Sequence, residues 1–408
     1  MTRTSSDCVI VGGGIGGAVL ALLLARAGKH VVLLERETHP HSAGRPEILA
    51  RSTVEIFREL GLRDRILAEA AIPLEGLELY GTRKKLLLHF SAEDFHAERT
   101  RLYSTDPART RQILLEAAEE TRSVEICRGV EAKKILFDGN FVCGIHGVRS
   151  GTPLEWRAPL VIGDDGGHSR VRECLGIPLK TREFPLEFLG AAGPRLRGMK
   201  EKIGEAWIHP GGFRREIFGG IFMPQPDQRT AFVFLVSAAA YAHFKKSPPA
   251  EFFNSLKKLS PFAEEIEKNF SFPEDFTLFR RPFGHASRYI ANGAALLGDA
   301  AHPVTPAGGQ GANGSVADAV VLAETALEAF QKNNFSCERL ARYEAKRRPA
   351  NERSIRFSVW ARRVFLSLRI FPWLSFLLPE FLKKVERSPQ RKRDFIRNVS
   401  TAFRTGEN

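Results

Sequence analysis

The sequence contains little cysteine and no long apolar run. Its 408 residues include five cysteines, which are Cys8, Cys127, Cys143, Cys174 and Cys337. They form no C-x-x-C pair and no metal-ligand spacing, so we expect no disulfide framework and no metal site, and their odd number suits a reducing compartment. No stretch reaches the roughly 18 unbroken apolar residues of a membrane-spanning helix. Five glycines interrupt the first apolar run, which is therefore not a secretory signal, and we expect a cytoplasmic protein.

A glycine-rich loop near the start of the sequence lies between two apolar segments. Residues 8–11 predict a buried parallel strand and residues 18–27 predict a helix. Between them, Gly12, Gly14 and Gly17 fit the pattern G-x-G-x-x-G. In this pattern the glycines allow a tight turn, the approach of a pyrophosphate, and close packing of the helix on the strand. The loop therefore predicts a dinucleotide site.

An acidic residue at the end of the next strand supports this prediction. Glu35 follows the apolar residues 31–34 and stands 23 residues after Gly12. That is near the spacing of about 20 at which a carboxylate binds a ribose hydroxyl, although the fingerprint alone does not separate NAD from FAD. The expected contacts in this region come from Gly12, Gly14, Ile15, Gly16, Gly17, Glu35 and Arg36.

A second segment with related chemistry lies almost three hundred residues later. The apolar residues 294–297 predict a strand that ends at Gly298-Asp299, and a turn rich in proline and glycine then leads into a helix that continues to Leu327. N–H groups at the start of a helix and a carboxylate after a strand suit the other end of an extended dinucleotide.

Two further motifs complete a resemblance to a known family. They are Arg111-Gln112-Ile113-Leu114, at the start of a predicted helix, and Val161-Ile162-Gly163-Asp164-Asp165-Gly166-Gly167-His168-Ser169-Arg170-Val171-Arg172. In this order, with the glycine loop and the late segment, they resemble the single-component FAD-dependent aromatic hydroxylases of the para-hydroxybenzoate hydroxylase type, which include the ubiquinone-pathway hydroxylases. The resemblance implies an α/β fold with a Rossmann-type FAD-binding domain, an inserted mixed β-sheet substrate domain and C-terminal helices.

The resemblance also implies roles for single residues. Asp299 would bind the ribitol hydroxyls, Asp165 and Gly166 would contact the FAD pyrophosphate, and Arg111 would lie close to the flavin. The flavin ring and its pyrimidine edge would be contacted by Pro306, Gly311, Ala312 and Asn313. In the family, NAD(P)H acts as a transient co-substrate, and O2 forms a flavin C(4a)-hydroperoxide that hydroxylates an electron-rich ring.

Two positions are open to more than one interpretation. Asp164 stands where many members of that family have alanine, and it adds an acid of unassigned role. Arg45 lies where family members bring a mobile loop to the flavin, so it is either an FAD or active-site residue or a surface arginine before a helix that begins near Ile48.

The predicted domains alternate along the chain. The FAD-binding domain takes residues 1–73, 101–180 and 281–335, the substrate-domain sheet takes residues 74–100 and 181–280, and a basic helical region takes residues 336–408.

The predicted insert is rich in phenylalanine and poor in tyrosine. Residues 76–280 hold 19 of the 30 phenylalanines. They predict either a phenylalanine-rich core or a pocket for a large apolar substrate. His209 and His243 are weak candidates for a base that deprotonates a phenol, since an arbitrary histidine is more often structural.

The positive charge is concentrated at the C-terminal end. Residues 339–408 carry 18 Lys and Arg against 6 Asp and Glu, out of a net charge of +13 for the whole chain. Within them, residues 364–378 are strongly apolar and lie between Arg362-Arg363 and Lys383-Lys384. This pattern predicts either peripheral contact with an anionic membrane or helices docked on the catalytic body. The apolar run argues against nucleic acid.

These patterns favour an FAD-dependent monooxygenase that uses NAD(P)H and O2 to hydroxylate a small aromatic or quinone-precursor substrate of lipophilic character. The alternatives are a flavin-dependent prenyl reductase or halogenase, and a non-catalytic flavin-binding protein associated with a membrane. The halogenase pattern W-x-W-x-I-P is absent from the sequence, as is the aromatic-Trp-Phe-Pro run of prenyl reductases. No pattern in the sequence indicates the oligomeric state.

Overall fold

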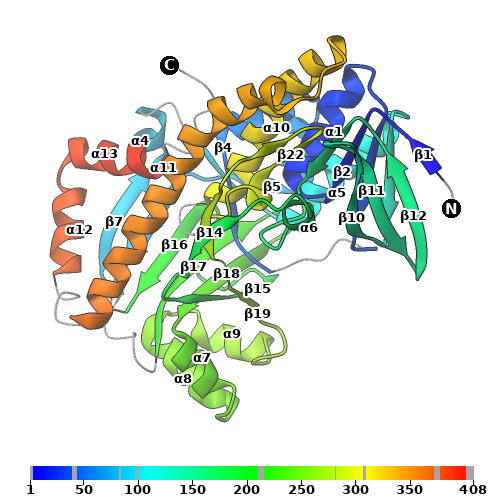
Figure 1. Ribbon diagram of the computed structural model, residues 1–408. Coiled ribbons are helices and arrows are strands. Elements are labelled where there is room, and N and C mark those ends of the chain that lie inside the picture. Colours follow the sequence, from blue (N-terminus) through cyan, green and yellow to red (C-terminus); the bar gives the residue numbers. More distant parts are fainter. Residues whose placement is uncertain are drawn as a thin grey trace.

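The computed structural model describes residues 3–38, 44–81, 84–97, 101–209, 216–280, 282–306, 309–371 and 377–400. Figure 1 shows a nucleotide-binding part on one side of the molecule, a large sheet beside it, and C-terminal helices along the opposite side.

A six-stranded sheet forms the centre of the nucleotide-binding part. Its strands are, in spatial order, β21 (Ile290–Ala291), β22 (Ala294–Leu296), β13 (Leu160–Gly163), β2 (Cys8–Val11), β3 (Val31–Glu35) and β9 (Val124–Arg128). All neighbouring pairs are parallel except the edge pair β21–β22. Every residue of β2, β3, β13 and β22 is buried, as expected for parallel strands that are covered on both faces.

Helices and a smaller sheet supply this cover. The helices that pack together next to the sheet are α1 (Ile15–Arg26), α5 (Pro107–Glu120) and α10 (Gln310–Gln331). A four-stranded sheet contacts β3 and β13 and contains β1 (Arg3–Ser5), β12 (Thr152–Arg157), β11 (Phe141–Arg149) and β10 (Val130–Asp138). Asp106 begins α5 by accepting hydrogen bonds from the N–H groups of Ala108 and Arg109, and Pro107 at the first helical position suits that start.

A seven-stranded mixed sheet is built from two distant segments of the chain. Its order is β19 (Thr277–Phe279), β15 (Glu187–Pro194), β18 (Arg229–Val236), β17 (Ile217–Gln225), β16 (Ile203–Ile208), β6 (Gly76–Tyr80) and β7 (Leu86–Ser91). The pair β16–β6 is parallel and joins the two segments, whereas the other pairs are antiparallel. The expected fold class, a Rossmann-type domain with an inserted mixed sheet and C-terminal helices, is confirmed.

Short elements connect the two sheets. The strands are β4 (Glu47–Ala50), β8 (Leu102–Thr105), β5 (Ala71–Pro73), β14 (Leu179–Arg182) and β20 (Phe283–Ala286), and the helices are α2 (Arg51–Glu59), α3 (Arg63–Glu69), α4 (Ala92–Ala97), α6 (Arg170–Cys174) and the 3-10 turn η2 (Gly298–Ala300). The expected helix is present but begins at Arg51 and not near Ile48, because Ile48 lies in β4 opposite Ser104 of β8. Pairing with a distant strand overrides the local pattern at this point.

The phenylalanine-rich insert is mainly a packed core. Three helices, α7 (Ala238–Phe244), α8 (Pro249–Leu259) and α9 (Ala263–Asn269), lie at one end of the large sheet (Figure 1). Phe222, Phe232 and Phe234 of the sheet are buried against phenylalanines of this helical part. Phe252 and Phe272 stack there with ring centroids 4.1 Å apart. The core interpretation therefore accounts for most of these side chains.

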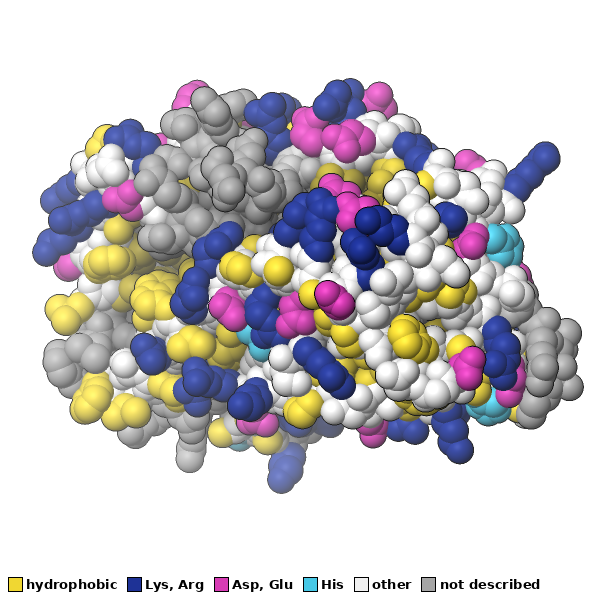
Figure 2. Space-filling view, turned by 45° about the horizontal axis from the view of Figure 1, so that its top comes forward, with side chains coloured by type: hydrophobic (Ala, Val, Ile, Leu, Met, Phe, Trp, Pro, Cys, Tyr) yellow, Lys and Arg dark blue, Asp and Glu magenta, His cyan; other side chains and the backbone are white. Residues whose placement is uncertain are grey.

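The C-terminal helices pack on the catalytic body. They are α11 (Cys337–Ile370), α12 (Leu378–Glu386) and α13 (Pro389–Ser400). Leu382, Val385 and Ile396 are buried in one cluster with Leu88 and Phe90 of β7. The described helices are therefore docked on the rest of the protein through these side chains, and contact of their outer face with a membrane stays a prediction. Residues 372–376, within the apolar run, lie outside the described residues. Figure 2 shows the side chains on the surface of the molecule, with hydrophobic and basic ones coloured.

Two kinds of feature are absent from the described residues. In the described ranges, no helix combines the length and the apolar character needed to cross a bilayer. The same ranges contain no group of three or more His, Cys, Asp or Glu side chains arranged to hold a metal ion.

Candidate functional site

A groove of about 230 Å³ lies where the carboxyl ends of β2, β13 and β22 meet. Such an edge is the usual ligand site of an open α/β sheet. Segments far apart in the sequence line this groove together: Gly14, Ile15, Arg45, Pro46, Glu47, Asp164, Gly166, Phe188, Val233, Phe279, Asp299, Val304, Thr305, Pro306, Gly309, Gln310, Gly311, Ala312 and Ser315.

The glycine loop shapes the first part of the groove. Gly12 has φ +106°, and a Cβ there would stand 2.2 Å from the carbonyl oxygen of Asp164, so the turn requires glycine. Gly14 precedes α1, whose first turn receives no hydrogen bond from a side-chain cap. Gly16 packs against Ser315, and the N–H of Gly17 donates to Asp164 Oδ2 at 2.7 Å. The N–H groups that can reach a ligand are therefore those around Gly14 and Ile15.

Glu35 lies behind the loop at the end of β3. Its carboxylate accepts hydrogen bonds from the N–H of Gly13 at 2.9 Å and from the N–H of Glu37 at 2.8 Å. Arg36 is exposed, and Arg111 of α5 forms an ion pair with Glu37 at 2.9 Å. The structure thus places Arg111 at the Glu35 end, and it is not among the described residues that line the groove.

The Asp-Gly segment forms the middle of the groove floor. Burial raises the pKa of the Asp164 carboxyl well above its ordinary value, the hydrogen bond from Gly17 opposes this, and the charge of Asp165 raises the pKa further. Asp165 Oδ2 accepts the N–H of Val171, so this side chain orders the start of α6. Asp164 is the acid of this pair that lines the groove, and Gly166 lies beside it.

Arg172 connects this segment to the third one. Its guanidinium is buried and donates to the carbonyl oxygens of Ala300 at 2.8 Å and Gly167 at 2.9 Å. Sequence reasoning did not single out this residue. The sequence does show an arginine on a short segment just after the Asp-Gly motif, but it does not indicate which distant carbonyl oxygens the guanidinium contacts.

A buried network of charged and polar groups contacts the segment that carries Asp299 on both sides of this residue. Asp318 is fully buried in α10 and accepts hydrogen bonds from His302, Arg347 and the N–H of Gly298. Burial acts to raise the pKa of Asp318, but the charges of His302 and Arg347 outweigh it and hold that pKa below the ordinary value. Asp299, between Gly298 and His302, lines the groove.

The start of α10 completes the flavin side. Gly309 has φ +63° and precedes α10, whose start receives no side-chain cap, and Gly311 and Ala312 of the first turn of α10 line the groove. The side chain of Asn313 points elsewhere: it accepts from the N–H of Ala50 at 2.8 Å and donates to the carbonyl oxygen of Ile48 at 2.8 Å. Asn313 therefore ties α10 to β4 and is not among the described groove residues.

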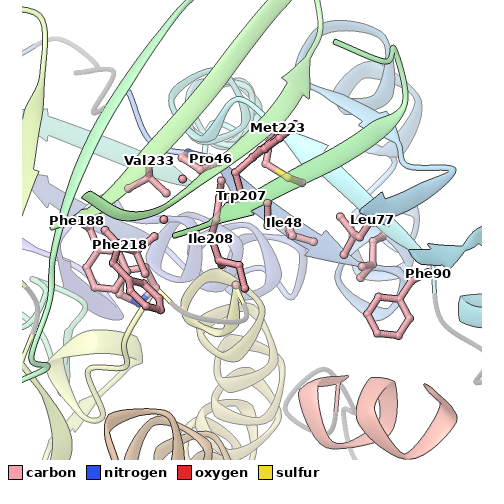
Figure 3. A pocket seen from close by; sticks show the side chains of 18 of the residues that line it. Pro46, Ile48, Leu77, Phe90, Phe188, Trp207, Ile208, Phe218, Met223 and Val233 are labelled. Atoms are coloured by element: carbon pink, nitrogen blue, oxygen red, sulfur yellow. The ribbon is translucent and has the colours of Figure 1, made fainter. Parts of the chain in front are cut away.

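A second, apolar cavity of about 370 Å³ lies between the large sheet and the C-terminal helices (Figure 3). Its described lining is Pro46, Ile48, Leu77, Phe90, Phe95, Leu102, Phe184, Phe188, Ala206, Trp207, Ile208, Phe218, Gly219, Gly220, Ile221, Met223, Val233, Leu235, Pro306, Gly309, Phe365 and Ile396. None of these residues carries an ionisable side chain. The cavity shares Pro46, Phe188, Val233, Pro306 and Gly309 with the groove, so the two spaces adjoin.

The two histidine candidates do not reach this cavity. His209 follows Ile208 at the end of β16, and its imidazole faces Glu216 at 3.8 Å. His243, on α7, lies 3.0 Å from Glu251 and is about half exposed. Neither histidine lines the described cavity, because one faces an acid beyond the end of its strand and the other sits on the outer helices. Arg45 does line the groove and lies 3.5 Å from Glu47.

The groove fits an extended dinucleotide such as FAD. Both helix starts that face it lack a side-chain cap, so their N–H groups can receive anionic and carbonyl oxygens. A Cβ at Gly14 would stand 2.7 Å from Asp164 Oδ2, so the close approach of the loop backbone to the Asp164 side chain depends on glycine at this position. The apolar residues shared with the second cavity suit a flat, largely apolar ring next to a substrate.

Comparisons with known proteins agree with this fit. Residues 5–358 match the family model described as FAD binding domain. The chain is 26% identical over 367 residues to 6-methylpretetramide 4-monooxygenase of Streptomyces rimosus, with 89% of this chain and 85% of that protein covered. It is 26% identical over 362 residues to ubiquinone hydroxylase UbiL of Rhodospirillum rubrum, with coverage of 85% and 78%.

A solved structure shows the same fold. The crystal structure of p-nitrophenol 4-monooxygenase PnpA from Pseudomonas putida DLL-E4 aligns with a TM-score of 0.79 at 18% identity and covers 99% of both chains. Because the family model spans residues 5–358 and the two relatives align over most of their length, this protein belongs to the FAD-dependent aromatic hydroxylase family and is an FAD-dependent monooxygenase.

Proposed function

We propose that the protein uses NAD(P)H and O2 to hydroxylate a lipophilic aromatic or quinone-precursor substrate. The observation that carries the proposal is the apolar cavity of about 370 Å³ that adjoins the FAD groove. A cavity without ionisable side chains in its described lining favours a neutral, largely apolar ring system. The name of one relative, ubiquinone hydroxylase, supports a substrate of this class.

Residues in the groove, with Glu35 next to it behind the glycine loop, would hold FAD along its length. Glu35 would bind the adenosine ribose, the N–H groups near Gly14 would bind the pyrophosphate, and Asp299 would bind the ribitol hydroxyls. Pro306 and the first turn of α10 at Gly311 would border the flavin ring. When bound, FAD supplies the electron transfer from NAD(P)H to O2 that the reaction requires. The sequence contains one dinucleotide fingerprint, which supports transient use of NAD(P)H beside the flavin.

The contribution of the cavity is binding, orientation and exclusion of water. Phe188, Val233 and Pro306 lie at the junction with the groove, so a ring packed against them stands next to the flavin position. Since no described lining residue can take a proton, the substrate must carry its own electron-donating substituents. We therefore expect good substrates to be electron-rich while still protonated, such as alkylated or alkoxylated phenols.

Two adjacent residues allow a direct test. Ile208 lines the cavity, whereas His209 faces Glu216. A polar group placed in an apolar site without a partner costs about 1–3 kcal/mol, or roughly 5- to 150-fold in kcat/KM. We expect Ile208→Asn to lose this much with a long-chain alkoxyphenol, while His209→Gln keeps the wild-type kcat/KM and pH profile.

The same assay separates the rival functions. NAD(P)H oxidation that rises on addition of the lipophilic phenol, with a product heavier by one oxygen atom, supports the proposal. Equal losses in both variants would show that the assigned cavity is not the substrate site. A product that gains halogen or two hydrogens would favour a halogenase or a prenyl reductase, and no turnover with any phenol would favour the non-catalytic alternative.

A further inference from the structure

The outer face of α11 carries a stripe of basic and apolar side chains. Arg353, Arg356, Trp360, Arg363 and Ile370 are exposed at steps of three, four or seven residues, and Phe371, just past the end of α11, is exposed as well. Trp360 is 52% exposed and Ile370 is 65% exposed, which is unusual for side chains of their size. The opposite face of the helix is buried, as Ser354, Ser358 and Ala361 show.

The next helix continues the pattern. On α12, Leu382 and Val385 face the catalytic body, while Phe381 is 55% exposed and Lys384 and Arg387 are exposed beside it. Leu377, the described residue before α12, is 57% exposed. Figure 2 shows hydrophobic and basic side chains intermixed on the side of the molecule where these helices lie.

Charge indicates what covers this surface. The sequence contains no Asp or Glu from residue 353 to residue 379, although it contains several arginines there. On α12, Glu380 forms an ion pair with Lys383, and the bases Lys383, Lys384 and Arg387 outnumber the acids Glu380 and Glu386. A second copy of the same face would place like charges against each other, whereas an anionic bilayer attracts basic side chains and accepts exposed aromatic and aliphatic ones at its interface.

We propose that this surface, the outward stripes of α11 and α12, binds reversibly to an anionic phospholipid bilayer. Of these two helices, α11 also forms part of the apolar cavity through Phe365, and Ile396 of the neighbouring helix α13 lines it as well. Bilayer docking therefore brings one wall of the cavity to the lipid. The proximity of the cavity to lipid matters for the route of a lipophilic substrate, and this part of the proposal rests on the proposed function. Binding of the protein to the bilayer does not depend on that function.

The test is sedimentation of the FAD-loaded protein with vesicles in the absence of substrate. Vesicles of phosphatidylcholine with phosphatidylglycerol should pellet the wild type at low salt and release it at high salt, and vesicles of phosphatidylcholine alone should not pellet it. Arg356→Gln with Arg363→Gln should weaken binding about fivefold for each charge removed. Trp360→Ser with Phe381→Ser should also weaken binding, because their apolar contact with the interface is lost.

Matched controls separate this surface from general stickiness. Phe137 and Phe141 are 55% and 39% exposed on β10 and β11, and Lys245 and Lys246 are exposed on or next to α7. Phe137→Ser with Phe141→Ser, and Lys245→Gln with Lys246→Gln, should bind vesicles like the wild type.

Three outcomes would overturn the proposal. In the first, the wild-type protein stays in the supernatant with anionic vesicles, and in the second, control and test variants bind these vesicles equally. In the third, the wild type does not bind vesicles but forms a concentration-dependent dimer, and the Trp360 and Phe381 variant does not form it. Retained flavin absorbance reports folding, and if the apolar variant loses it, the arginine variant decides the question. Since no substrate is present, failure here leaves the proposed hydroxylation standing, and failure of hydroxylation leaves vesicle binding standing.

Discussion

Replacement of Asp318 by asparagine should destabilise the protein far more than loss of an exposed ion pair between the same two helices. Asp318 has no exposed surface, and Arg347, which donates from Nε at 2.6 Å, is 3% exposed. Removing one partner of a buried pair leaves the other charge unpaired and costs about 3–5 kcal/mol. The matched control is Glu324→Gln, because Glu324 and Lys346 also join α10 to α11, at 3.3 Å, but are about half exposed. Exposed pairs contribute only about 0–1 kcal/mol.

The measurement is urea unfolding of the two variants and the wild type, followed by circular dichroism. The pKa of Asp318 is lower in the folded protein than in the unfolded chain, so its contribution is present above about pH 4 and disappears as the pH falls toward the folded pKa. The stability gap between wild type and Asp318→Asn should therefore narrow in acid. If Asp318→Asn costs no more than Glu324→Gln at neutral pH, the network does not hold the Asp299 segment as described.

Three further predictions concern FAD and the groove. Gly14→Val should abolish FAD binding while the fold persists, because the added branched group occupies the space next to Asp164; a variant still saturated with flavin by absorbance would contradict this. Asp164→Asn keeps an oxygen that accepts the N–H of Gly17. Because burial raises the pKa of the Asp164 carboxyl in the folded protein, the stability of the wild type relative to the variant should fall as the pH rises above about 4. If the melting temperatures of the two apoproteins change in parallel over this range, the raised pKa of Asp164 is refuted. Asp299→Ala should weaken FAD binding by about 1.5–3 kcal/mol in a fluorescence titration of the apoprotein, and unchanged affinity would remove Asp299 from the site.

The groove could be predicted from the sequence because its parts follow a local rule. Gly14, Asp164 and Asp299 each stand within three residues of the end of a short buried strand, and the carboxyl ends of parallel strands meet at one edge of the sheet. The separation of almost three hundred residues between the first and the last does not matter to that rule.

The remaining features depend on contacts that no local pattern contains. Phe365 and Ile396 reach the apolar cavity only because α11 and α13 fold back on the large sheet. Asn313 was expected at the flavin, but its side-chain amide is occupied by the backbone of β4, by Thr53 and by the carbonyl oxygen of Gly309. The strand β4 itself forms by pairing with the distant β8. His209 was a candidate base because an imidazole can take up a proton near neutral pH. Its ring faces Glu216 and not the cavity, and this direction depends on where β16 ends, which the sequence does not show.

The most direct test of the central claim is a turnover experiment with isotope-labelled O2. Purified protein that retains FAD is incubated with NADH or NADPH and an electron-rich lipophilic phenol, and the product is examined by mass spectrometry. The account predicts that one labelled oxygen atom enters the ring and that omission of the phenol slows NAD(P)H oxidation. Unlabelled product, or NAD(P)H oxidation that no phenol accelerates, would contradict it.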